Sequence, residues 1–352
     1  MLEAPAKALR RRALSLMTFN VLAPCYFRQG GRLESADRAA FLARAQAAIR
    51  TIQREQCHVV CLQEFWFQRE YERAFRAAFA PTHDVHTAKR PGDKEDGLAV
   101  LVDRRALELR HVQHVPLGDP RRPGDRVAML VHVATRWNRD VLPLEQRSLL
   151  LVNSHLTFPH AEAYKATRLD EIKLVLESAR EYVARERLER VPILMCGDFN
   201  DSNDDVHRLV TTHGFTSVFG HMHGREARVT HCNHNNREVG VDFIFGAHLH
   251  GTTPAALAPG QHRHDAPPFR APVDRLKLVP TACHLLPRRL PDVARLKRPR
   301  FVPDWSAVRQ PEEYASEDAL VEYWRMVSDH RPLVASFDVL GSPVGAPTTG
   351  QR

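Results

Sequence analysis

The sequence predicts an α/β sandwich in which helices cover a mixed β-sheet. Short apolar runs alternate along the chain with longer segments whose apolar residues recur at helical spacing. Several of these runs end at a polar residue, as strands do at the rim of an α/β sheet. The 352 residues are 43% hydrophobic, which is enough for a sizeable core in one large domain or two small ones.

Buried strands are expected where a short apolar run ends at a polar residue. The segment "LSLMTFNVL" (14–22) contains Asn20 as such a residue, and "HVVCLQE" (58–64) ends on a carboxylate. Further strands are expected at 98–103, 127–135, 148–156, 191–200, 241–247 and 331–340.

Two long helices and one short helix are expected between these strands. Ser35 is placed to cap a helix over 36–56. A longer helix is expected over 161–188, and a short one near 315–326. The positions that form a buried stripe are Phe41, Leu42, Ala45, Ala48, Ile49 and Ile52 in the first helix, and Leu169, Ile172, Leu176, Ala179 and Val183 in the second.

One domain is expected over residues 14–341. Residues 1–13 are expected to form a basic extension before it, and residues 342–352 a flexible tail. The segment 248–327 is rich in Pro, His and Arg, and most of it shows no clear strand or helix pattern. We therefore expect a basic, partly disordered insertion in the domain.

The composition indicates the cellular compartment of the protein and the kind of partner that it binds. Six cysteines without a CxxC pair indicate a reducing compartment, and we expect the cytoplasm, with the nucleus or the mitochondrion as alternatives. No apolar run approaches the ~20 residues of a membrane span, so a soluble protein is expected. The formal net charge of +8 points to a polyanionic partner such as nucleic acid.

Polar side chains gather at the expected strand ends. Because strand ends of an α/β sheet converge on one rim, residues far apart in sequence can share a site there. Each residue alone has an ordinary explanation, such as a turn cap or a surface carboxylate. Their combination is more specific, and it consists of Asn20, Glu64, His155, Asp198, Asn200, Asp242, Asp329 and His330. The further acidic residues of "GDFNDSNDD", Asp201, Asp204 and Asp205, are expected to form a solvated turn.

Six motifs in this order resemble those of the endonuclease/exonuclease/phosphatase superfamily: "MTFNVL", "VCLQEFW", "VNSHLTFPH", "CGDFND", "GVDFIFG" and "SDHRPL". The resemblance implies a deoxyribonuclease-I-like fold, a four-layer α/β sandwich of two packed mixed sheets flanked by helices. "FNVLAP", "CLQEFW" and "NSHL" are most similar to the branch of carbon-catabolite-repressor-type deadenylases and nocturnin. "GDRVAMLVHV" and "THCNHNN" resemble plant members described as calcium-binding, but the chain has no D-x-[DN]-x-[DN]-G loop, so no calcium site is expected.

The resemblance implies a hydrolase that uses Mg²⁺, or alternatively Mn²⁺, to neutralise an anionic phosphoester. Asn20, Glu64 and Asp329 are the implied metal ligands. One metal ion or two would fit the sequence equally well.

The resemblance also implies roles for the remaining residues. Asp198 would orient or deprotonate the attacking water, and Asn200 would donate a hydrogen bond to a phosphoryl oxygen. His155 would contact the scissile phosphate. His330 would pair with Asp242 and act either as a base or as a charged clamp on the phosphate.

Two groups outside these motifs are candidates for binding. Phe158 and His160 follow the "NSHL" motif, and Asn233, His234 and Asn235 precede the Asp242 strand, so both groups are expected to line the substrate site. The histidines 221, 223, 231 and 234 could instead suggest zinc, although no tight ligand pair supports that interpretation.

Three functions remain open from the sequence. The first is a nuclease, specifically a 3′-to-5′ exoribonuclease of the deadenylase type, with RNA such as poly(A) as substrate; the charge and the motifs favour it. The second is a sphingomyelin-type or phosphoinositide phosphoesterase, because superfamily membership does not discriminate between substrates. The third is an inactive nucleic-acid-binding module, which would require the loss of a catalytic position.

Overall fold

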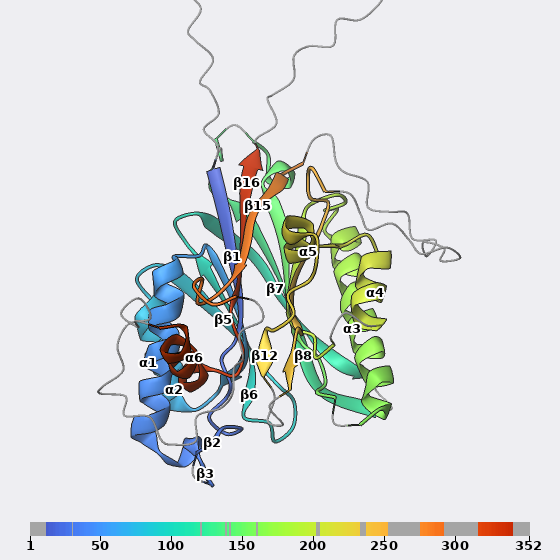
Figure 1. The fold of residues 1–352 in the computed structure, drawn as a ribbon. Helices are drawn as coiled ribbons and strands as arrows, with labels where there is room; N and C mark the ends of the chain where they lie inside the picture. Colours follow the sequence, from blue (N-terminus) through green and yellow to red (C-terminus); the bar gives the residue numbers. More distant parts are fainter. Residues whose placement is uncertain are drawn as a thin grey trace, which may run out of the picture.

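Two β-sheets pack face to face, and helices cover both outer faces (Figure 1). The predicted α/β sandwich is therefore confirmed, including the four-layer arrangement that the resemblance implied. The computed structural model describes residues 12–29, 31–119, 122–137, 139–140, 142–159, 161–201, 205–232, 237–252, 275–291 and 316–340.

The first sheet carries one half of the site. Its described strands run in the order β15 (Lys277–Leu285), β16 (Leu333–Leu340), β1 (Arg12–Asn20), β4 (Val59–Trp66), β6 (Asp96–Asp103) and β5 (His83–Lys89). β1 is parallel to β4 and antiparallel to β16. The end of β1, the end of β4 and the start of β16 consequently lie at the same edge of the sheet.

The second sheet carries the other half of the site. Its described strands run in the order β11 (Thr216–Ser217), β14 (Asp242–Ala247), β10 (Ile193–Asp198), β9 (Ser148–His155), β8 (Arg122–Thr135) and β7 (Leu107–Asp119). β10 is parallel to β9 and antiparallel to β14. The ends of β9 and β10 thus meet the start of β14.

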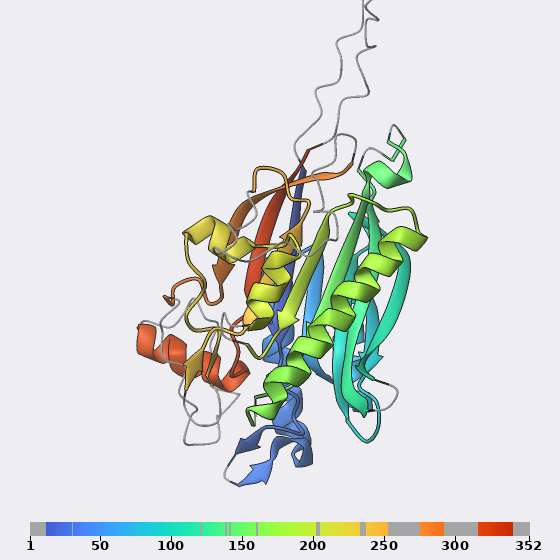
Figure 2. The ribbon, with the colours of Figure 1, turned by 90° about the vertical axis from the view of Figure 1, so that its right-hand side faces the viewer.

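Three apolar layers hold this arrangement together. One lies between the first sheet and the helices α1 (Arg38–Glu55), α2 (Arg69–Phe79) and α6 (Glu317–Val327). The second lies between the two sheets, and the third between the second sheet and the helices α3 (Ala163–Arg185) and α4 (Asp205–Thr212). Figure 2 shows α3 running along the second sheet. Each fully buried large apolar side chain in these layers contributes about 1.5–3 kcal/mol.

The first long helix starts later than the sequence suggested. Ser35 lies in a 3₁₀ turn (Glu34–Ala36), and the side chain of Asp37 caps α1 by accepting a hydrogen bond from the amide of Ala40 at 3.1 Å. Either residue type can cap a helix, so the pattern located the helix but not its cap.

Several elements were not predicted. The helix α2 and the strands β5, β7 and β15 fall outside the expected runs. Of these, β15 lies inside the segment 248–327, so residues 277–285 belong to the first sheet and not to an irregular insertion. β15 is an edge strand with a bulge between Pro280 and Ala282, and proline is tolerated in strands at such positions. The short helix expected near 315–326 is present as α6.

Candidate active site

Strand ends of both sheets converge to form the site. In the first sheet, Asn20 pairs with Gln63, so Glu64 follows directly beyond that pair. In the second sheet, Asp198 lies between His155 of β9 and Asp242 of β14. The site therefore lies where the ends of β1, β4, β9 and β10 come together.

Glu64 reaches the site because β4 breaks its regular pattern there. The strand has a bulge at Glu64, whose φ of 54° lies in the left-handed region. Its carboxylate accepts hydrogen bonds from the Asn20 side chain at 3.2 Å and from the Ala23 amide at 3.0 Å. Glu64 remains partly exposed, while Asn20 is fully buried.

The amide of Asn20 joins the two sheets. Its Nδ2 donates to Glu64 Oε1 in the first sheet and to Asp198 Oδ2 in the second sheet, at 3.2 and 3.0 Å. Its Oδ1 accepts a hydrogen bond from the amide of Leu22 at 3.0 Å. Because both carboxylates need a donor, the nitrogen of the Asn20 amide must face them.

Asp198 and Asn200 are held by the turn that follows β10. Asp198 Oδ1 accepts a hydrogen bond from the backbone N–H of Asn200 at 2.9 Å. The side-chain Nδ2 of Asn200 donates to the carbonyl of Leu156 at 2.9 Å. Gly197 makes close packing possible, because a Cβ there would lie 1.8 Å from the carbonyl oxygen of Ser154. One of the two amide hydrogens of Asn200 is therefore used within the protein.

His330 and Asp242 are in direct contact although 88 positions separate them. His330 Nδ1 lies 2.9 Å from Asp242 Oδ2. The backbone amide of His330 donates to Ser328 Oγ, and Ser328 Oγ donates to the carbonyl of Asn20 at 2.8 Å. Burial alone would lower the pKa of His330, but the carboxylates of Asp242 and Asp198 outweigh it and raise that pKa.

His155 and His330 differ in charge. Burial lowers the pKa of His155 well below its usual value, and the positive charge of Arg126 lowers it further. His155 Nε2 lies 3.4 Å from Asp198 Oδ2, and His330 Nε2 lies 3.6 Å from the same atom. At neutral pH a neutral imidazole and a positively charged one therefore face the same carboxylate.

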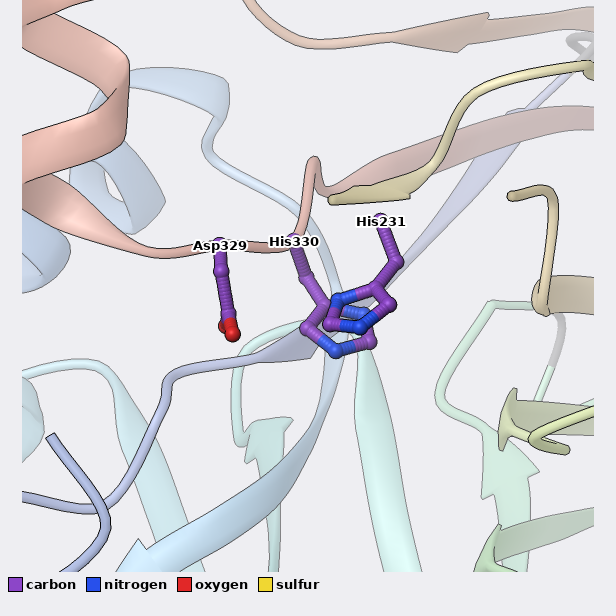
Figure 3. Close-up of side chains that lie close together, drawn as sticks. All are labelled: His231, Asp329 and His330. Carbon is purple, nitrogen blue, oxygen red and sulfur yellow. The ribbon is translucent and has the colours of Figure 1, made fainter. Parts of the chain in front are cut away.

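His231 is a site residue that the motif analysis did not assign. It lies in the two-residue strand β12 (His231–Cys232), and its ring stacks on that of His330 with centroids 3.9 Å apart. Figure 3 shows the two imidazoles stacked, with the side chain of Asp329 beside them. The "THCNH" segment contained a signal for His231, but as one histidine among four in that part of the chain.

Of the five predicted substrate-binding residues, the structure describes only Phe158. Phe158 is partly buried just past the end of β9. The substrate-binding candidates His160, Asn233, His234 and Asn235 lie outside the described residues.

The expected solvated acidic turn after β10 is wrong for Asp201. This residue is buried, and its carboxylate accepts a hydrogen bond from the amide of Val206 at 3.1 Å in the first turn of α4. Asp205 pairs with Lys165 of α3 at 3.0 Å. Asp204 lies outside the described residues. The acidic run therefore serves partly to start a helix.

The donor set suits a divalent cation. Burial raises the pKa of Glu64 to about 7, and the nearby negative charges of Asp329 and Asp96 add to that rise. Asp242 Oδ1 is buried and has no hydrogen-bond partner among the described residues. Crowded carboxylates with unused oxygen atoms are the environment that a hard cation such as Mg²⁺ stabilises.

Two groups of three side chains could each hold a metal ion, because the ligand atoms within each group lie within 4.8 Å of one another. One consists of Asp198, Asp242 and His330, and the other of His231, Asp329 and His330. Both include His330, so they are neighbouring parts of a single site.

Comparison with known proteins assigns the chain to a family. Residues 17–330 match the model of the Endonuclease/Exonuclease/phosphatase family. The chain therefore belongs to this family.

One curated relative matches part of the chain. It is an uncharacterized calcium-binding protein of Arabidopsis thaliana, 29% identical over 258 residues, which cover 68% of this chain. The match covers 52% of the relative, so the chain spans about half the length of that protein.

Solved structures share the fold at low sequence identity. ANGEL2, a 2′,3′-cyclic phosphatase solved with adenosine-2′,3′-vanadate, superposes with a TM-score of 0.61 and 17% identity, covering 94% of this chain and 96% of its own. The human nocturnin catalytic domain gives a TM-score of 0.56 and 14% identity, covering 94% and 97%. These likenesses support the deoxyribonuclease-I-like fold.

No helix among the described residues is long and apolar enough to cross a membrane.

Proposed function

We propose that this chain is a divalent-cation-dependent phosphodiester hydrolase acting on nucleic acid, specifically a 3′-to-5′ exoribonuclease of the deadenylase type. The observation that carries the hydrolase assignment is the buried carboxylate of Asp198, which contacts Asn20, His155 and His330 at once. The formal net charge of +8 and the deadenylase-like motifs support nucleic acid as the substrate.

Glu64 and Asp329 are the residues that we propose to hold the cation. When bound, Mg²⁺ or Mn²⁺ would neutralise negative charge on the phosphoryl oxygens and orient the phosphoester. Asn20, which the motifs suggested as a third ligand, has a different task in this proposal. Its Nδ2 donates to both Glu64 and Asp198. Asn20 therefore fixes the proposed cation ligand Glu64 relative to Asp198, the residue proposed to act on the attacking water.

Asp198 is the proposed base or orienting group for the attacking water. Burial raises its pKa, and the positive charge of His330 opposes that rise. A more basic carboxylate accepts a proton from water more readily, while the hydrogen bonds from Asn20 and Asn200 fix its orientation. The second amide hydrogen of Asn200 is the one we assign to a phosphoryl oxygen.

His330 is the proposed charged clamp on the phosphate. Asp242 orients the imidazole through Nδ1, so Nε2 is directed toward Asp198 and the reacting group. The raised pKa favours a protonated ring, and a protonated ring is a hydrogen-bond donor and not a base. Neutral His155 then contacts the scissile phosphate as a second, uncharged partner.

A hydrolysis panel tests the proposal. Wild-type protein and the Asp198→Ala variant are incubated with Mg²⁺ and oligo(A), mixed RNA, single-stranded DNA, sphingomyelin or phosphoinositides. We expect cleavage of RNA from the 3′ end, with oligo(A) preferred, and at least a ~100-fold loss in the variant, the usual scale for a positioned catalytic group.

Other outcomes would contradict specific parts of the proposal. Cleavage of lipids alone would replace the nuclease by a lipid phosphoesterase. Equal activity of the wild type and the variant would reject the role of Asp198, and activity in excess EDTA would reject cation dependence.

A further inference from the structure

Arg126 of β8 is a buried cation whose hydrogen-bonding capacity is largely unused. Its exposed fraction is 7%, and neither Nε nor Nη1 has a hydrogen-bond partner among the described residues. The nearest described carboxylate, Asp125, lies 3.5 Å from Nε. Asp125 also pairs with Arg90 at 2.6 Å and with Lys94 at 3.3 Å, so its charge is shared by three cations.

The strand register places Arg126 beside the active site. Ala128 of β8 pairs with Ser154 of β9, so Arg126 is level with the segment that follows His155. Among the charged groups, Arg126 makes the largest contribution to the lowered pKa of His155, and Arg90 the second largest. Arg126 therefore acts electrostatically on the residue that is assigned to the scissile phosphate.

Arg331 and Arg44, two other buried arginines, make a useful contrast. Arg331 donates to four backbone carbonyls, and Arg44 binds the Glu34 carboxylate and three carbonyls. A buried guanidinium without such acceptors is costly, because it has lost water and gained little in return. Its planar fork of donors matches the oxygens of a phosphate. The buried guanidinium of Arg126 therefore has free donors with which it can bind an anion.

We propose that Arg126 binds a second phosphate group of the substrate, next to the scissile phosphoester, with Arg90 adding positive charge. This inference rests on the proposed function and deepens it. It assigns to the site a preference for a nucleic-acid strand with at least two phosphates over a substrate with one phosphate, such as a dinucleoside monophosphate or sphingomyelin.

Short oligonucleotides that differ by one phosphate test the inference. The kcat/KM is measured with Mg²⁺ for ApA, which has one phosphate, and for pApA, ApAp and ApApA, which have two. In the wild type we expect at least one two-phosphate substrate to be preferred. The ratio of its kcat/KM to that of ApA should fall about 10- to 100-fold in Arg126→Gln, the scale of charge-assisted hydrogen bonds. An equal loss on all four substrates would overturn the proposal.

Binding without turnover separates this inference from the proposed function. In the Asp198→Ala background with EDTA, pApA, ApAp or ApApA should bind more tightly than ApA, and adding Arg126→Gln should abolish that difference. Equal affinities before the second substitution would reject the second-phosphate site, even if hydrolysis is observed. Preferred binding of a phosphoinositide with several phosphates over every oligonucleotide would overturn the assignment to a nucleic-acid strand.

Thermal stability gives an independent readout. Because Arg126→Gln removes a buried cation with unused donors, we expect it to raise the Tm, whereas a purely structural arginine would lower it. Arg147→Gln is the matched control, because Arg147 is equally buried but donates to the carbonyls of Leu142 and Thr135. The control should lower the Tm and leave the substrate ratio unchanged, and a lower Tm in Arg126→Gln with an unchanged ratio would overturn the proposal.

Discussion

At the scale of single residues, the site depends on backbone conformations that most side chains avoid. Glu64 and Asn200 both have φ near +50°, at 54° and 49°. Such conformations cost of the order of 1–3 kcal/mol each and persist where surrounding contacts fix them. At Glu64 those contacts are the hydrogen bonds to its carboxylate from Asn20 and Ala23. The strain therefore aims one carboxylate out of the strand and into the site.

Substitution of Glu64 tests whether its carboxylate holds the cation. In Glu64→Gln the amide keeps the shape but loses the charge that attracts a divalent ion, so metal affinity should fall by at least about 10-fold. Binding of Mn²⁺ is measured by calorimetry, and the rise in Tm on adding Mg²⁺ is measured in parallel. The control is Glu108→Gln, which removes a carboxylate paired with Arg110 on β7. Unchanged metal affinity in Glu64→Gln would contradict its role as a ligand.

The sequence revealed those site residues that flank an apolar strand. The pairing of Asp242 with His330 was implied by the resemblance to the family motifs, and the structure brings the two side chains into contact although 88 positions separate them. His231 could not be found from a flanking strand, because it lies in a strand of two residues without an apolar run. Arg126 was hidden for another reason, since only the structure shows that its donors lack acceptors. Position along a strand can be read from sequence, but hydrogen-bond satisfaction cannot.

At the scale of elements, α1 fixes the loops that carry the site. The guanidinium of Arg44 in α1 pairs with the buried carboxylate of Glu34. It also donates to the carbonyls of Val21 and Leu22 after β1, and to that of Val327 at the end of α6. The chain segments that lead away from Asn20 and toward Asp329 are thereby attached to one side chain.

Loss of this attachment should destabilise the protein. Arg44→Met leaves the Glu34 carboxylate buried without its cation, and breaking a buried pair in this way costs about 3–5 kcal/mol. The free energy of unfolding is measured by urea denaturation. The double variant Glu34→Leu/Arg44→Met removes both charges and should recover part of the loss. A double variant less stable than the single one by a further several kcal/mol would show that the ion pair itself is not what Arg44→Met disrupts.

Elements were predictable where burial imposes a simple pattern. The helix α3 was found because its buried residues recur along one stripe, while β4 and β9 were found as continuous buried runs. β5 and β15 have mixed burial along their length, so their polar residues obscured the strand pattern. Edge strands are more exposed than central strands, so their sequences show a weaker apolar pattern and are harder to recognise as strands.

At the scale of the whole molecule, a buried polar contact fixes the distance between the two sheets beneath the site. Gln63 of β4 donates from Nε2 to Asn153 Oδ1 at 2.7 Å. Asn153 Nδ2 donates to the carbonyls of Leu62 and Ala99, at 3.0 and 3.1 Å. Gln63 precedes Glu64 directly, and Asn153 lies two residues before His155. The contact therefore connects the two halves of the site.

Asn153→Leu should weaken both the fold and the chemistry. The variant loses the hydrogen bonds of Asn153 to the Gln63 side chain and to the carbonyls of Leu62 and Ala99, so the free energy of unfolding should fall by about 2–4 kcal/mol. Because Glu64 and His155 are no longer held at a fixed separation, kcat should fall more than KM rises. Ser154→Ala is the control, since Ser154 Oγ is buried without a hydrogen-bond partner among the described residues and its removal should be nearly neutral. A kcat unchanged in Asn153→Leu would reject the coupling of the sheets to the site.

The stability of the whole molecule should depend on pH through His132, which lies in β8 far from the cation site. Burial lowers its pKa to about 4, and the charge of Arg110 lowers it further. The neutral ring contacts the hydroxyls of Tyr182 and Ser148 at 3.2 and 3.0 Å. An unfolded histidine titrates near pH 6.5, so the unfolded chain takes up this proton first as the pH falls. The contribution of His132 is thus complete above about pH 6.5 and is lost progressively toward pH 4.

The pH effect is isolated by comparing the wild type with His132→Gln in urea unfolding at pH 8.0 and pH 4.5. The difference between the two pKa values corresponds to about 3 kcal/mol, of which roughly 2–3 kcal/mol should be lost by pH 4.5. Other groups titrate equally in both proteins and cancel in the comparison. The variant should be less stable at pH 8.0, because it gives up the contacts to Tyr182 and Ser148, but its stability should decrease less on acidification. Parallel decreases in the two proteins would show that His132 remains neutral in the unfolded chain or is protonated in the folded one, and would reject this assignment.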